Sequence, residues 1–219
     1  MVAAMVSPLI ARLTSQVKYA ILPTTNRIRK GGHMSQLVNR MVRAAMLDVN
    51  LYEEVEADTR ATGQALIVVL IYSICAGIGS ALVDLSKISA GHFFWGLFVG
   101  LLTALIFWLI WSLITYFVGT TIFRGPETSA TYGELLRTIG FSATPGILMI
   151  FAFVPFIGWL ISLVAWVWML IAMVIAVRQA LDFTTWRAIG TCAVGGIAYL
   201  VFALLLGLIA GLGAMVFLW

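Results

Sequence analysis

The residues best suited to chemistry are four carboxylates within six positions: Glu53, Glu54, Glu56 and Asp58. On a helix, Glu53 and Glu56 would share a face, which is compatible with a general acid/base pair or with a metal site. No histidine lies nearby, because His33 and His92 are the only two in the chain. We therefore interpret the cluster as the last solvated stretch before a membrane span and as a candidate docking patch. The sequence predicts no catalytic residues and no metal site.

Other reactive side chains lead to the same conclusion. Cys75 and Cys192 lie in apolar surroundings without metal-ligand spacing, which is typical of small core residues. Ser142 resembles a serine nucleophile in its surroundings, but no histidine follows His92, so a Ser–His pair on later helices cannot form. The sequence predicts no cofactor and no nucleic-acid partner.

The composition indicates that these residues lie on or beside membrane-spanning helices. The 219-residue chain is 62% hydrophobic and 10% charged, whereas a soluble domain is about 25% charged. Uncharged stretches long enough to cross a bilayer predict five spans, at about 62–83, 93–118, 138–153, 157–177 and 190–217. Pro145 and Pro155 divide the long charge-free stretch between Arg137 and Arg178, so the third span is short or re-entrant. The expected fold is an all-α polytopic membrane protein with a five-helix transmembrane bundle.

The distribution of basic residues predicts the orientation of the bundle. With the N-terminus inside, every Lys and Arg except Lys87 lies in a cytoplasmic segment. Five spans then place Trp219 on the opposite side of the membrane.

The polar region before the first span divides into two expected segments. Residues 1–33 are expected to form a basic amphipathic arm. This arm is native, a scar, or a stretch upstream of a true start at Met34. Residues 34–61 form a cytoplasmic amphipathic and acidic segment, and the membrane domain follows at 62–219. Apolar residues at helical spacing predict N-terminal amphipathic helices. Basic residues there are expected to lie on an anionic leaflet. They are Arg12, Lys18, Arg27, Arg29, Lys30, Arg40 and Arg43.

Small residues at four-residue spacing predict close helix packing. They occur in the second and fifth spans, where small side chains let backbones approach, and the favoured interpretation is packing within the bundle rather than between molecules. The residues are Gly96, Gly100, Ala203, Gly207 and Gly211.

Four segments carry a family resemblance. They read DVNLYEEVEAD at 48–58, TYGELLR at 131–137, PG at 145–146 and VRQALD at 177–182. With these segments the chain, from about residue 35 onward, resembles a bacterial member of the Yip domain family, the Ypt/Rab-interacting-protein-like five-span membrane proteins. The resemblance implies a cytoplasmic N-terminal region, a compact helical bundle, and work by binding other proteins or shaping membranes rather than catalysis.

These observations predict a non-enzymatic scaffold or adaptor of the bacterial cytoplasmic membrane, with an anionic leaflet and other membrane proteins as its partners, in a larger complex or a homo-oligomer. One alternative is an accessory subunit of a larger membrane complex, for example an energy-transducing one. Another is a small transporter or channel that uses the break at Pro145.

Overall fold

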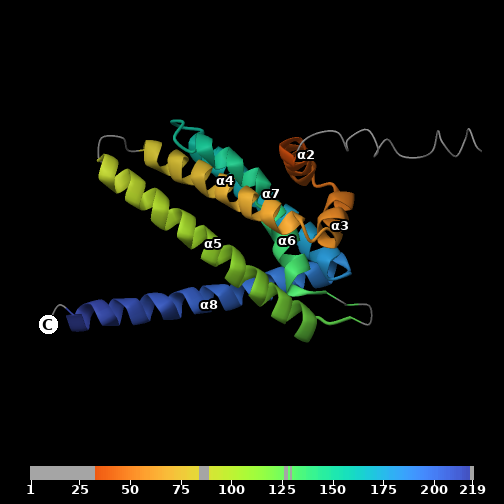
Figure 1. Ribbon diagram of the computed structural model, residues 1–219. Helices are drawn as coiled ribbons and strands as arrows, with labels where there is room; N and C mark the ends of the chain where they lie inside the picture. The colour runs from red at the N-terminus through yellow and green to blue at the C-terminus, as the bar shows by residue number, and fades with distance from the viewer. Residues whose placement is uncertain (1–32, 84–88, 126–127, 129, 218–219) are drawn as a thin grey trace, which may run out of the picture. The chain divides into compact units, whose positions relative to one another are not determined.

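The computed structural model describes residues 33–83, 89–125, 128 and 130–217, and every regular element within them is helical. The elements are α2 (His33–Ala45), α3 (Val49–Ala57), α4 (Ala61–Ala81), α5 (Ala90–Thr121), α6 (Tyr132–Ser142), the 3₁₀ helix η4 (Thr144–Phe151), α7 (Gly158–Ala180) and α8 (Thr185–Phe217) (Figure 1). The predicted all-α class is confirmed, and α2 provides one of the expected helices before the first span.

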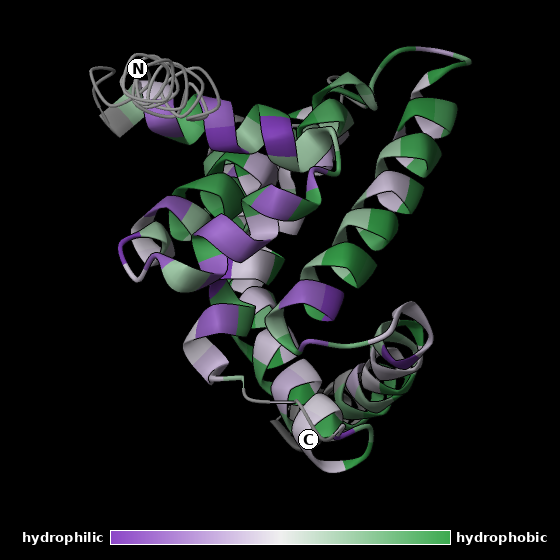
Figure 2. Ribbon diagram, turned by 90° about the vertical axis from the view of Figure 1, so that its right-hand side faces the viewer, coloured by the Kyte–Doolittle hydropathy of each residue, from purple (hydrophilic) through white to green (hydrophobic). Residues whose placement is uncertain are grey.

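Five helical segments of the described chain are long and apolar enough to cross a membrane. They are α4, α5, the continuous α6–η4 segment, α7 and α8, so the predicted five spans are confirmed. Figure 2 shows these helices in green to white over most of their length. The second unit of the chain, residues 40–219, contains all five.

The third span lies at the centre of the bundle. Over its most apolar window 61% of its residues are buried, against 17–28% for the other four. Pro145, near the start of η4, marks the change from α-helix to 3₁₀ helix, and η4 contacts both α4 and α7. The segment spans Tyr132–Phe151, so it begins earlier than predicted and includes Arg137.

Local sequence signals set the ends of the helices. Thr131 and Glu134 form a capping box, in which Glu134 accepts from the Thr131 backbone N–H at 2.7 Å. At the C-terminal end of α7, Asp182 adopts a φ of 51°, and the N–H of Phe183 donates a hydrogen bond to the carbonyl of Arg178 at 2.9 Å. This geometry ends α7 in a Schellman turn.

Close packing occurs at glycines other than the predicted ones. A Cβ on Gly79 of α4 would lie 2.0 Å from the carbonyl oxygen of Met149 in η4, and one on Gly140 of α6 would lie 2.7 Å from the Ala65 side chain. Only glycine lets these backbones approach so closely.

The predicted packing role of Gly96 and Gly100 is wrong within the described bundle. Both are exposed on α5, and a Cβ at either would meet nothing within 4 Å. Spacing alone placed them in one row, but that row faces away from the neighbouring backbones. Ala203, Gly207 and Gly211 lie on α8, and their surroundings are outside what the structure describes.

Candidate functional site

Polar and charged side chains from several helices contact α3. Arg40 reaches Glu54, Arg137 of α6 reaches the last turn of α3, and Gln179 of α7 donates to Glu53 at 2.9 Å. Side chains from before and after α3 therefore hold this short helix in place.

Arg40 is buried, with 3% of its surface exposed. Its guanidinium donates to Glu54 at 2.9 Å, to Asp58 at 2.8 Å and to the Gln64 side chain at 2.8 Å. The prediction that Arg40 lies on a lipid leaflet is therefore wrong. A buried guanidinium needs paired acceptors, and two members of the acidic cluster supply them.

Arg43 extends this ion-pair group at the surface. It donates to Asp48 at 2.7 Å and also pairs with Glu54. The hydrogen bond from Arg43 is the main reason why the pKa of Asp48 lies below its usual range. Burial would raise the pKa of Asp58, but the hydrogen bond from Arg40 and further interactions lower it. Arg43 thus binds carboxylates of this chain on a half-exposed surface.

The remaining predicted leaflet-binding residues lie in the first 32 positions, outside the described residues. They are Arg12, Lys18, Arg27, Arg29 and Lys30.

Arg137 is the main structural residue that the sequence interpretation missed. It lies on α6 with 6% of its surface exposed, and it donates to the carbonyl of Val55 at 2.9 Å and to that of Glu56. These carbonyls belong to the last turn of α3, where backbone acceptors lack helical partners and the helix dipole favours a cation. Arg137 therefore caps α3 from a different helix. The Thr131-x-x-Glu134 capping box was the signal that could have placed Arg137 inside a helix.

Glu56 is half-buried beside this cap. Burial raises its pKa to about 7, and repulsion from Glu134 and Asp182 adds to the rise, with a smaller addition from Glu53, while Arg137 opposes it. A carboxyl group with this pKa exchanges its proton near neutral pH. In the described part of the chain, no group of three or more His, Cys, Asp or Glu side chains is placed to hold a metal ion.

The four carboxylates of the predicted docking patch consequently divide into two pairs. Glu54 and Asp58 bind Arg40, whereas Glu53 and Glu56 face the ends of α6 and α7. Glu53 is exposed, and so is Asp182 just after α7. Glu54 is exposed as well, but its carboxylate is bonded to Arg40 and Arg43.

The chain matches the family model of the Yip1 domain over residues 50–218. No curated protein and no solved structure shows a significant match to it. The matched segment begins in α3 and includes Arg137 and all five spans. Because this match covers more than half of the chain, the chain belongs to the Yip1 domain family.

Proposed function

We propose that this protein is a non-enzymatic scaffold or adaptor in a bacterial cytoplasmic membrane and that it acts through contacts with other membrane proteins. The observation that carries the proposal is the fixation of α3. Arg137 holds its last turn, Arg40 holds its side, and Gln179 holds Glu53. A helix held in this way presents its exposed residues without an ordering cost on binding, which favours recognition by a partner.

The α3 end of the bundle is the cytoplasmic end in this proposal. Arg124 follows α5, Arg178 lies in the last turn of α7 and Arg187 lies in the first turn of α8, so exposed or partly exposed arginines lie in or beside the described connections at this end. An excess of such residues marks cytoplasmic loops. The N-terminus then lies in the cytoplasm and the C-terminus on the opposite side.

The acidic contact surface is made of Glu53 and Asp182. Both side chains are exposed, and Glu53 is joined to α7 through Gln179. Exposed ion pairs contribute about 0.2–1 kcal/mol each and weaken as salt rises. A basic partner surface bound here would therefore be retained in a graded, salt-sensitive way.

Cross-linking in native membranes, followed by mild solubilisation and mass spectrometry, tests this proposal. Glu53→Arg should reduce the recovery of specific co-purifying proteins, and its difference from wild type should shrink as salt rises, because screening weakens the ion pairs of the wild type. Thr59→Arg is the control, because it introduces the same side chain at an exposed position beyond α3 and leaves Glu53 in place.

Identical recovery for wild type and Glu53→Arg at all salt concentrations would contradict a docking role for this surface. A stoichiometric complex with fixed partners would instead favour the accessory-subunit alternative. A Glu53→Gln protein that inserts and assembles normally but loses all cellular activity would indicate an active site.

A further inference from the structure

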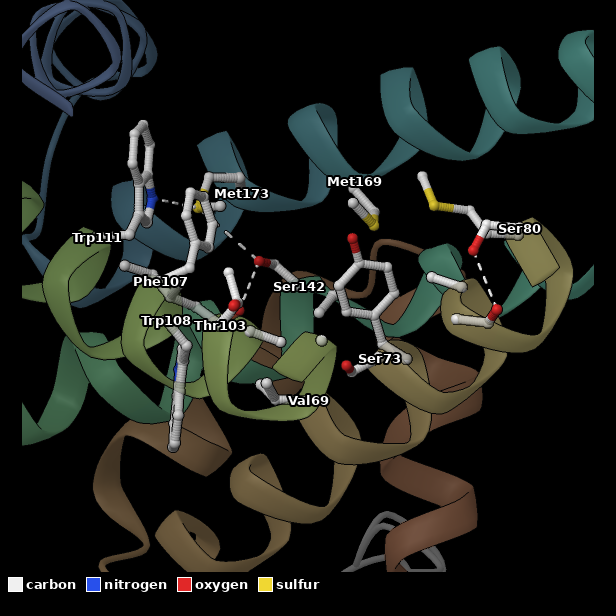
Figure 3. A pocket seen from close by; sticks show the side chains of 18 of the residues that line it. Val69, Ser73, Ser80, Thr103, Phe107, Trp108, Trp111, Ser142, Met169 and Met173 are labelled. Carbon is white, nitrogen blue, oxygen red and sulfur yellow. Dashed lines mark hydrogen bonds between the residues drawn. The ribbon is translucent and has the colours of Figure 1, made fainter. Parts of the chain in front are cut away.

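A cavity of about 720 Å³ lies within the membrane-spanning part of the bundle (Figure 3). Its walls come from α4, α5, the α6–η4 segment and α7, and all of its lining residues are uncharged. Ligand sites in proteins typically have volumes of about 300–1,000 Å³ and are mostly apolar with a few polar groups. The cavity has the size and the character of such a site.

The small residues of α4 and α5 make room for this cavity. Gly77 and Ser80 of α4 and Gly100 and Thr103 of α5 all line it. Gly100 and Thr103 are also exposed on α5, so the cavity reaches the surface that faces lipid. The glycine at position 100, which does not pack against a helix, instead leaves space at the entrance.

Several hydroxyl groups line the cavity, and those of Ser73, Thr103 and Ser142 are among the ones with unused hydrogen-bonding capacity. Ser73 is 8% exposed, and neither its hydroxyl nor that of Thr103 has a hydrogen-bond partner among the described residues. Ser142 donates to the carbonyl of Ile139 at 2.7 Å and keeps its lone pairs free. Figure 3 shows the three side chains on different walls of the cavity. The Ser73 hydroxyl opens on the cavity and has no acceptor in the described part of the chain, so it can donate to a ligand with an acceptor oxygen.

The two ends of the cavity differ. Phe107, Trp111 and Met173 form one end, and Figure 3 shows them near Ser142, whereas Ser80 and Met169 lie toward the other end. Trp111 donates its indole N–H to the sulfur of Met173, so it presents an apolar face with its donor already used. The first end therefore suits a flat or branched apolar group.

We propose that this cavity binds an uncharged lipid that carries carbonyl oxygens, with its hydrocarbon in the apolar part and a carbonyl accepting from Ser73. An anionic headgroup is disfavoured, because no lining residue could pair with its charge. Water alone is disfavoured, because a buried water needs two to four polar partners and most of the lining is apolar. The carbonyl can belong to an ester of a diacylglycerol or to a prenylquinone ring.

Photo-cross-linking of the full chain in nanodiscs tests the proposal. The probes are a diazirine-bearing diacylglycerol, a diazirine-bearing prenylquinone, and a phosphatidylglycerol with the same photoreactive chain as the diacylglycerol. At least one of the two uncharged probes should label peptides of α4, α5 or α7 at the cavity, and the phosphatidylglycerol should label them much less. Whichever uncharged probe labels identifies the source of the carbonyl.

Matched variants locate the site. Gly100→Leu should reduce labelling on the order of tenfold, because a large side chain at the entrance fills cavity space. Gly96→Leu is its control, since it lies one turn earlier on α5, is equally unobstructed and does not line the cavity. Ser73→Ala should weaken binding about fivefold by removing one hydrogen bond. Ser112→Ala removes a buried hydroxyl outside the cavity and should change nothing.

Equal labelling by the charged and uncharged probes would overturn the proposal. So would equal labelling of the Gly100→Leu and Gly96→Leu proteins. If Gly100→Leu does not fold, unchanged affinity in Ser73→Ala would overturn it. Absence of labelling together with a disulfide between two Gly100→Cys chains would show that a second copy of the protein covers this surface instead.

Discussion

Replacing Glu56 by glutamine should stabilise the bundle at pH 8 and change little at pH 5. The carboxyl group has a pKa of about 7 instead of its ordinary 4.5, first because of burial and then because Glu134 and Asp182 repel its charge, with Glu53 adding and Arg137 opposing. A raised pKa means that the folded protein holds the proton more tightly than the unfolded chain does. Stability is therefore lost as the pH rises from about 4.5, and the loss is complete above about 7.

The size of the effect follows from this interval. At about 1.36 kcal/mol per pH unit it corresponds to about 3.4 kcal/mol, and solvent around the half-exposed side chain reduces this to about 1–2 kcal/mol. Glutamine is uncharged at every pH and keeps the backbone carbonyl of residue 56 available to Arg137. The variant should therefore avoid the cost that the ionised carboxylate imposes.

Thermal unfolding of the detergent-solubilised protein between pH 5 and 8.5 measures this effect. Glu56→Gln should raise Tm by about 2–8 °C at pH 8, with little change at pH 5. Glu53→Gln, at an exposed position of the same helix, should produce a much smaller rise at high pH, because Glu53 makes the smallest of the repulsive contributions to the Glu56 pKa. A Tm difference between Glu56→Gln and wild type that is the same at pH 5 and pH 8 would refute the reasoning.

Three further predictions concern the bundle. Arg40→Met should cost about 2–4 kcal/mol, because Glu54 and Asp58 lose their buried partner; chemical or thermal unfolding at neutral pH measures the loss, and an unchanged midpoint would contradict it. Gly79→Val should destabilise the bundle by about 1–3 kcal/mol or more by overpacking against Met149, whereas Gly96→Val should not, and equal unfolding midpoints would contradict the packing. In intact cells, Phe156→Cys should react with an impermeant thiol reagent and Arg124→Cys should not; reversed labelling would invert the topology.

The spans were predictable because length and the absence of charge suffice to define them. A helix that crosses hydrocarbon needs about 20 apolar residues wherever its neighbours lie. The ends were less predictable. The sequence predicted that the third span begins just after Arg137. In the structure Arg137 lies within α6 with 6% of its surface exposed, because the last turn of α3 supplies acceptors for it.

The role of each charge could not be predicted from spacing. Arg40 lies 14 and 18 positions before its partners Glu54 and Asp58, so it forms none of the one-turn pairs that a helical pattern reveals. In the same way, Gly79 and Gly100 each have small residues near them in sequence. A Cβ at Gly79 would meet the backbone of η4, whereas a Cβ at Gly100 would meet nothing within 4 Å. Only the arrangement of the helices decides between these outcomes.

The cap on α3 also imposes an order on biosynthesis. Arg40 is made before Glu54 and Asp58, so that contact can form as soon as the segment leaves the ribosome. Arg137 is synthesised 82 residues after Val55. At about 5–20 residues per second, the last turn of α3 waits roughly 4–16 s for its cap. During that interval the first and second spans are already entering the bilayer, and the last turn of α3 is capped only when the third span joins them.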